Sequence, residues 1–419
     1  ENTNGNNNIG IGINTLVGLV DDTTIASDNV SIGYQAGMHI KSKNNICIGT
    51  NSISSTNTIG DDNIAIGFQS GATMKGGINC SSNILIGKRS GLICENKDNI
   101  YIGNNSGTLN ISGKSNVYIG TNAGQNAVGK ESVIIGFSAG SAATTTDTII
   151  GFNAGQGANG SQNTLIGYNV GGTCTSNNTI MGYNAGKNSA GSDNTIIGKG
   201  SGTNIKSDYN IVVGSNSLTS NLPDGFDGNV VVGYSSGRKI VAGGNTYIGN
   251  EAGKNNAGTD NVIVGDNAGV FASEKTTKHN VIIGKEAGRN LQGDYNVVIG
   301  SGAGYSNITN KINKNLLVGY KTGELNNKYD NLLVIGNSSV SDLEETTTSY
   351  YNDSENIIIG NNSAQKVNSF GNLVIGNNSG NLITTGNSNI LIGEKTGDKL
   401  VSGNRNLFLG SGKSLIYKK

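Results

Sequence analysis

The chain of 419 residues contains a single proline, no tryptophan and only 14% charged residues. With so little proline it does not have the composition of a plain disordered linker, and without a strict glycine triplet it is not collagen. The Leu- and Ala-rich pattern of helical domains is missing too. What the sequence has instead is 66 glycines and abundant asparagine. This composition argues against an ordinary globular domain.

An excess of charge of one sign and long apolar runs are also missing. Lys+Arg and Asp+Glu each number 29, so the formal net charge is zero. No basic run could neutralise a phosphate backbone, and we therefore expect no nucleic-acid partner. No apolar run approaches the ~20 residues of a membrane span, so we expect no membrane insertion. The chain starts at Glu1 rather than Met, so it could be a processed protein or part of a longer one.

One motif, Asn-x-Φ-Φ-Gly with Φ apolar, recurs along the whole chain, as at 63–67 and 163–167. About 24 copies occur at a usual spacing of about 16 residues. Ser132 and Asp147 replace the asparagine in two copies, and the copy at 331–336 carries one extra residue, which suggests a bulge. Each copy continues as Gly-x-x-(Ala/Ser/Thr)-Gly and then as a polar stretch of variable length.

Short segments rich in Ile, Val and Thr that end at glycine predict β-strands. A period of about 16 residues is too short for repeats that contain a helix, but it suits one coil of a solenoid. We therefore predict an all-β parallel β-solenoid of about 24 coils in a single continuous domain, 1–419. Residues 1–13 would form an N-terminal capping coil, 14–410 the repeats and 411–419 the C-terminal end.

The strands are apolar on both faces. The first and third residues after the asparagine share one face, and the third is always apolar, so we assign this face to the interior of the coil. The second residue points the other way and is usually apolar too, as in Ile134 and Leu165. A strand that is apolar on both sides needs cover on both. This predicts that another copy of the chain packs against it about a common axis.

The recurring asparagine suits a ladder in which identical amides bond from coil to coil. We assign this structural role to Asn163, Asn178, Asn194 and Asn210.

The residue directly after the strand glycine is often charged or polar, so this position must be exposed. It is aromatic in about eight copies, and four of these, Phe137, Phe152, Tyr168 and Tyr183, lie in consecutive coils. Stacked coils would align the four rings into an exposed ridge. We hypothesise that this ridge binds a glycan or another surface, against the alternative of a self-stacking ladder that only stiffens the corner.

The unit Asn-Thr-Ile-Ile-Gly-x-x-Ala-Gly, seen at 178–186 and 194–198, resembles the head repeats of trimeric autotransporter (YadA-like) adhesins. It is also similar to repeats in bacteriophage tail fibres and in fibres of large DNA viruses. The resemblance implies a left-handed parallel β-roll, three chains per fibre and attachment to host surfaces. The period here is a couple of residues longer than the usual coil of that family.

We expect no catalysis, metal or cofactor. The two histidines, His39 and His279, lie far apart in the sequence and beside no visible nucleophile, and no pair of carboxylates is marked for glycan cleavage. None of the four cysteines forms a CxxC pair. Cys80 and Cys94 lie in variable stretches of consecutive coils, so stacking could bring them within disulfide range, although free buried thiols fit equally well. Cys47, at a second strand position, should pack as a small apolar residue.

The expected function is that of a structural fibre or adhesin segment, extracellular or on a cell or virion surface. Its partners would be copies of itself, as a homotrimer or another homo-oligomer, and a host-surface glycan or protein that binds the exposed corners and variable loops. One alternative is an ice-binding solenoid, because Thr148, Thr164, Thr179 and Thr195 form a row, although on the face assigned to the interior. The other alternative is a glycan-degrading viral spike.

Overall fold

The computed structural model describes residues 5–17, 26–55, 59–75, 77, 79–143, 146–220, 222–305, 312–324, 330–340 and 354–412. Within these ranges the regular structure consists of 24 short β-strands, with no helix. The chain divides into two compact units, Glu1–Lys206 and Ser207–Lys419, each described here by itself. The all-β parallel β-solenoid with a period near 16 residues is confirmed.

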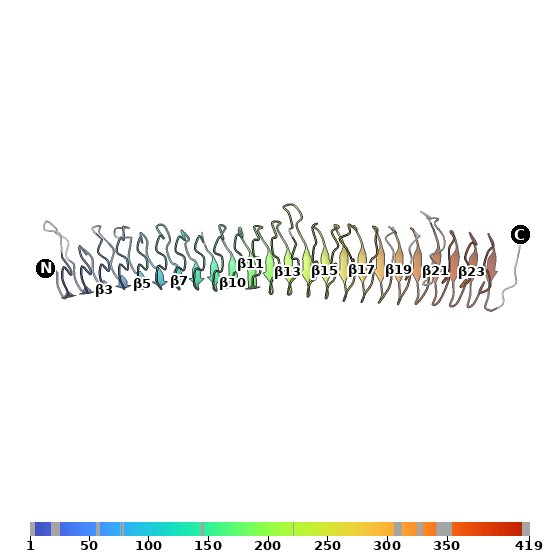
Figure 1. The fold of residues 1–419 in the computed structure, drawn as a ribbon, viewed down its shortest axis with the longest axis horizontal. Helices are drawn as coiled ribbons and strands as arrows, with labels where there is room; N and C mark the ends of the chain where they lie inside the picture. The colour runs from blue at the N-terminus through green and yellow to red at the C-terminus, as the bar shows by residue number, and fades with distance from the viewer. Residues whose placement is uncertain are drawn as a thin grey trace. The chain divides into compact units, whose positions relative to one another are not determined.

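The first unit stacks one strand per coil, and every strand pairs in parallel with the strand of the next coil (Figure 1). The register is unshifted, so residues at the same position of the motif stack directly, as Ile64 does on Ile84. The strands are β1 (Ile9–Ile11), β2 (Val30–Ile32), β3 (Ile46–Ile48), β4 (Ile64–Ile66), β5 (Ile84–Ile86), β6 (Ile100–Ile102), β7 (Val117–Ile119), β8 (Val133–Ile135), β9 (Thr148–Ile150), β10 (Thr164–Tyr168), β11 (Thr179–Tyr183) and β12 (Thr195–Ile197).

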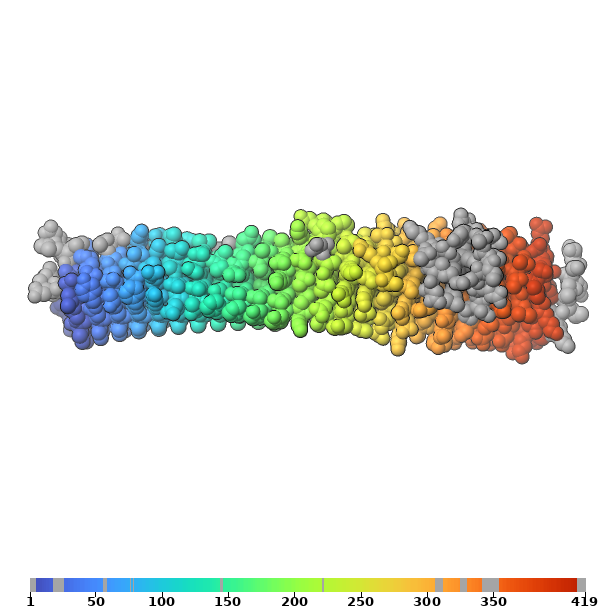
Figure 2. Space-filling model, viewed as in Figure 1, coloured from blue at the N-terminus to red at the C-terminus, as the bar shows by residue number. Residues whose placement is uncertain are grey.

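The second unit repeats this arrangement with the same parallel register. In a space-filling view the consecutive coils of each unit pack directly on one another (Figure 2). The strands are β13 (Ile211–Val213), β14 (Val230–Val232), β15 (Thr246–Ile248), β16 (Val262–Val264), β17 (Val281–Ile283), β18 (Val297–Ile299), β19 (Leu316–Val318), β20 (Leu333–Ile335), β21 (Ile357–Ile359), β22 (Leu373–Ile375), β23 (Ile390–Ile392) and β24 (Leu407–Leu409).

The interior of each coil is lined by the second residue of the strand. This residue is buried in every strand from β2 to β24, whereas its two neighbours are half-buried or exposed. Its size varies from Ala65 and Cys47 to Tyr118 and Tyr247, all of them fully buried. The expectation that the first and third residues line the interior was therefore wrong. The asparagine before the strand is buried as well, and side chains two residues apart share a face, so asparagine and second residue point inward together.

The buried asparagines form a hydrogen-bonded ladder in each unit. In the first unit, Asn163 Oδ1 accepts from the backbone N–H of Asn178 at 3.0 Å and from its Nδ2 at 3.2 Å, and Asn178 Oδ1 accepts from the N–H of Asn194 at 3.0 Å. In the second unit, Asn210 Oδ1 accepts from the N–H and the Nδ2 of Asn229, both at 3.0 Å. Each amide thus satisfies a backbone donor that would otherwise be buried without a partner.

Two glycines recur in most coils, and the first of them is required by geometry. The glycine that ends each strand lies directly on its counterpart in the next coil: a Cβ on Gly136, at φ +136°, would lie 2.2 Å from the carbonyl oxygen of Gly151. The second glycine turns the chain in the left-handed region and packs on the interior residue. A Cβ on Gly107, at φ +56°, would lie 2.6 Å from the ring of Tyr101. The strand glycine therefore tolerates no side chain, whereas the second position does in some coils, as in Ile53 at φ +41° and Val340 at φ +54°.

One detail of the register differs from expectation. The extra residue at 331–336 makes no bulge, because Leu332 occupies the asparagine position: it is 1% exposed, and its N–H donates to Asn315 Oδ1 at 3.0 Å. The inserted residue therefore shifts the strand by one position, so that β20 begins at Leu333. In the first coil, β1 pairs in parallel with β2, and residues 13–16 form a turn.

Candidate functional site

The side of the strands that points away from the interior is an apolar strip. We call the first- and third-position side chains of the strands the outer face. In the first unit the third position is isoleucine in every strand except β11, where it is Met181. The parallel register stacks these side chains in a row, as in Ile150, Ile166 and Met181. They cover one another only along the row, and Met181 and Ile197 each remain 37% exposed.

The strands of the second unit have an apolar outer face of their own. Its third position is isoleucine or valine from β13 to β23, and its first position is Ile, Val or Leu except at Thr246. Ile335, Ile359 and Ile392 are 37–40% exposed. No strand in the described ranges has a charged residue on this face. Strands of parallel sheets are normally covered on both sides, so an uncovered apolar outer face is unusual for a protein in water.

The threonine row lies on the outer face, not in the interior. Thr148, Thr164, Thr179 and Thr195 occupy the first position of β9 to β12 and are stacked in register. All four are half-buried. The position of the row therefore no longer argues against ice binding. Its four hydroxyl groups interrupt an otherwise aliphatic strip.

The four aromatic residues expected to align do so, and we call Phe137, Phe152, Tyr168 and Tyr183 the aromatic ridge. Successive ring centroids are 5.3, 5.1 and 5.0 Å apart, and successive ring planes differ by 10° or less. Each ring is between 41% and 50% exposed. β10 and β11 extend to Tyr168 and Tyr183, so by strand alternation these two rings lie on the same side as the outer face and border it.

The stacking determines what the ridge can offer a ligand. Phe152 and Tyr168 each have a ring against both of their faces, and a separation of about 5 Å leaves no room for a sugar between two rings. Only the ring edges and the two end faces, on Phe137 and Tyr183, are not covered by another ring of the ridge. Sugars stack on aromatic faces rather than edges. The geometry therefore favours the self-stacking ladder over a glycan-binding strip.

All four cysteines are buried, and none of them forms a disulfide. Cys80 and Cys94 do lie together in stacked coils, as expected from the sequence, but they are not bonded: the Cys80 thiol donates to the carbonyl oxygen of Cys94 at 3.0 Å. Cys47 packs in the interior, where burial raises the pKa of its thiol to about 12. Burial likewise raises the pKa of Cys174 to about 12. Thiols with raised pKa values are poor nucleophiles at neutral pH.

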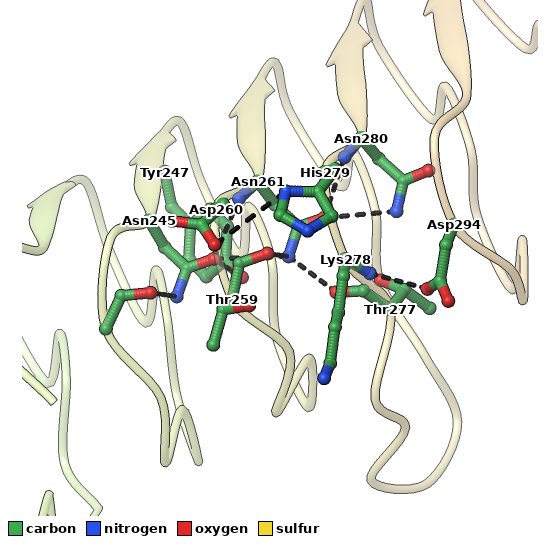
Figure 3. Close-up of polar contacts among 11 residues, drawn as sticks. Asn245, Tyr247, Thr259, Asp260, Asn261, Thr277, Lys278, His279, Asn280 and Asp294 are labelled. Atoms are coloured by element: carbon green, nitrogen blue, oxygen red, sulfur yellow. Dashed lines mark hydrogen bonds and ion pairs between the residues drawn. The ribbon is translucent and has the colours of Figure 1, made fainter.

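The histidines form no catalytic constellation. His279 lies on an exposed corner of the second unit, where its Nδ1 is 3.7 Å from the Asp260 carboxylate (Figure 3). Its imidazole also stacks on the Tyr295 ring, with the two centroids 4.8 Å apart. All three residues precede the ladder position of their coils. In the described part of the chain, no hydroxyl or thiol bonds to His279. His39 lies half-buried in the first unit.

Within the described ranges, no three or more His, Cys, Asp or Glu side chains gather closely enough to hold a metal ion, and no helix is long and apolar enough to cross a membrane. No protein-family model matches the chain, and no curated protein sequence is similar to it. The features that stand out are therefore surfaces: the outer face, the aromatic ridge beside it, and the corners.

Proposed function

We propose that this chain is a structural segment of an extracellular or virion-surface fibre, in which copies of the chain pack against one another through their outer faces. The observation that carries the proposal is the uncharged, half-exposed aliphatic strip that follows the strands of each unit. The copies would supply the cover that the sheet itself lacks. The corners and variable loops would then remain at the surface for attachment.

The size of the outer face suits stable association. Covering the remaining third or so of an aliphatic side chain contributes about 0.5–1 kcal/mol. Each coil offers two such side chains, so roughly ten coils would contribute on the order of 10–20 kcal/mol per copy. Losses of rotational and translational freedom cost roughly 4–15 kcal/mol. A small patch could not offset that cost, whereas a strip repeated in coil after coil can.

Three copies are the arrangement we favour. The strip is only one short strand wide, and a narrow apolar edge is covered best when several copies meet at a common axis. The resemblance of the repeats to trimeric adhesin heads supports the same number and a role in adhesion to host surfaces. The aromatic ridge, which borders the outer face at Tyr168 and Tyr183, would add apolar contact at the rim of such an interface.

The test is to place charge on the outer face. Ile150→Glu combined with Ile166→Glu introduces two stacked carboxylates there, and we expect the assembly to dissociate into folded single chains. The matched control is Gln156→Glu with Asn126→Glu, two exposed corner residues of the same unit, which should leave the assembly intact. Sedimentation measures the mass, and circular dichroism the fold.

A milder pair of substitutions tests the same interface if the charged variant does not fold. Ile150→Thr with Ile166→Thr places on the third-position row the residue type that already occupies the neighbouring row, and we expect it to weaken association without unfolding the chain. If both outer-face pairs leave the mass unchanged, the outer face is not the interface and the proposal is wrong.

Ice binding is a second candidate, because the four outward threonines present regularly spaced hydroxyl groups on a flat strand surface. A thermal-hysteresis measurement on the wild type and on Thr164→Val with Thr179→Val tests it. Hysteresis that is lost in this variant would support ice binding, and its absence in the wild type would exclude it.

A further inference from the structure

A polar groove lies on the corners of three consecutive coils of the first unit, in the turns that follow β3, β4 and β5. It has a volume of about 630 Å³, within the range of small-ligand sites. Its walls include Asn51, Gln69 and Arg89 from the row two residues after the strand glycine, and Thr73, Lys75 and Leu92 from farther along the turns. None of these residues belongs to a strand, so the groove would stay open when outer faces are covered.

The groove is built on rigid backbone. The N–H groups of Gln69 and Arg89 donate to carbonyl oxygens of the preceding coil, at 3.0 and 2.9 Å. Thr73 is held twice by the carbonyl oxygen of Leu92, through its N–H at 2.9 Å and its Oγ1 at 2.6 Å. A site whose walls are fixed before binding loses less conformational entropy on binding.

The groove is electropositive, and its two cationic side chains can bind an anionic ligand. Lys75 and Arg89 are both exposed, and neither forms an ion pair with an acidic side chain of the described residues. Arg89 Nε donates to Gln69 Oε1 at 3.1 Å. That bond fixes the plane of the guanidinium group and leaves its two terminal nitrogens, which suit bidentate binding of a carboxylate.

The other lining groups narrow the choice of ligand. The amides of Asn51 and Gln69 and the hydroxyl of Ser54 can exchange hydrogen bonds with hydroxyl groups, and the side chains of Leu92 and Ala72 offer apolar contact. A ligand that matches the cations, the amides and the apolar side chains of the groove carries an anionic group, several hydroxyl groups and a C–H face. Two cations are too few for the phosphate backbone of a nucleic acid.

We propose that this groove binds an acidic sugar, a carboxylate-bearing unit of a surface glycan. The carboxylate would lie against Arg89 and Lys75, the ring hydroxyls against the amides, and the C–H face on Leu92. The inference deepens the attachment role in the proposed function and rests on it for its biological setting. A failure of this inference can be told apart from a failure of the proposed function. Groove substitutions should change glycan binding and leave the mass of the assembly unaltered, whereas outer-face substitutions should change the mass.

The experiment measures binding of 3′-sialyllactose and of neutral lactose to the full chain, by saturation-transfer NMR and titration calorimetry. The wild type should bind the acidic sugar and not the neutral one. Arg89→Gln and Lys75→Gln should each weaken binding by about tenfold or more, the usual effect of losing a charge-assisted hydrogen bond. Lys187→Gln, at an exposed corner elsewhere in the unit, is the matched control and should bind like the wild type.

Three outcomes overturn the proposal. One is equal binding of lactose and sialyllactose, and another is unchanged binding by Arg89→Gln. The third is competition by inorganic phosphate or a glutamate peptide as strong as by free sialic acid, which would make the groove a general anion site. Preservation of the fold in each variant is checked by circular dichroism.

Discussion

The asparagine ladder makes a quantitative prediction at Asn63, which has a full set of partners. Its Nδ2 donates to Asn45 Oδ1 at 3.1 Å and to the carbonyl oxygens of Gly60 and Cys80, each at 2.9 Å. Its Oδ1 accepts from the backbone N–H of Asn83 at 3.1 Å and from the Asn83 Nδ2 at 3.0 Å. Asn63 is fully buried, so water cannot replace these bonds without opening the coil.

Asn63→Ala should therefore cost about 3–5 kcal/mol locally. The two hydrogens of Nδ2 make about two bonds at a time, each of which contributes about 1 kcal/mol net, and the N–H of Asn83, left buried without an acceptor, costs a further 1–3 kcal/mol or so. Because each coil contacts only its neighbours, a global unfolding midpoint does not show which coils a substitution weakens. Hydrogen exchange resolves the effect: amides of β4, β5 and Asn83 should exchange about a hundred- to a thousandfold faster, while those of β9 to β12 should not change.

The control for this experiment is Asn104→Ala, an asparagine on an exposed corner of the same unit. Surface substitutions of this kind change the stability by about 0.5 kcal/mol or less, so its exchange pattern should match the wild type. If Asn63→Ala exchanges no faster than the control, the ladder contributes nothing to holding the coils together and this reasoning is refuted.

Three further predictions concern the interior and the corners. Asp147→Asn should raise the unfolding temperature by the equivalent of about 1 kcal/mol. This side chain is 1% exposed in a ladder position, and an amide keeps the bonds from Asn163 while adding the Nδ2 donor that Asn116 and Asn178 use to bond carbonyl oxygens; a lower unfolding temperature would contradict it. Gly136→Ala should disrupt its coil, because the added methyl group collides with the next coil. Gly225→Ala, with no atom within 4 Å of the added methyl group, should lower the free energy of unfolding by only about 1 kcal/mol. Urea unfolding measures both variants, and equal effects would refute the steric argument. Burial raises the pKa of the Cys47 thiol from about 9 in the unfolded chain to about 12 in the folded one. Between these pH values the free energy of unfolding should therefore fall with rising pH, by up to about 1.4 kcal/mol per pH unit. Cys47→Ala should remove that part of the slope, and an unchanged slope would contradict the prediction.

The coil itself could be predicted from the sequence, because its period, strand glycine and asparagine are all local signals. Which face is inside was predicted wrongly, although the information was present. A stacked, buried asparagine fixes its own side of the strand as the interior, and the second residue shares that side. The constancy of isoleucine at the third position was misinterpreted as a core signal, when the core residue is the one whose size varies, as from Ala65 to Tyr118.

The remaining differences have physical causes that a repeat pattern does not reveal. One inserted residue before Leu332 could make a bulge or shift the register, and only the packing of that leucine into the ladder decides between them. The aromatic ridge was predicted, but whether rings in neighbouring coils stack depends on side-chain angles. The groove between Arg89 and Lys75 was missed, because its walls come from the turns of three different coils that only the stack brings together.

The central claim is that the outer faces of several copies cover one another. The mass of the native assembly in solution, measured by sedimentation equilibrium at micromolar concentration, tests it most directly. We expect a mass that is a whole-number multiple of the 43.0 kDa chain, and we favour three copies. A stable, soluble single chain of 43.0 kDa, with its aliphatic strip open to water, would contradict it.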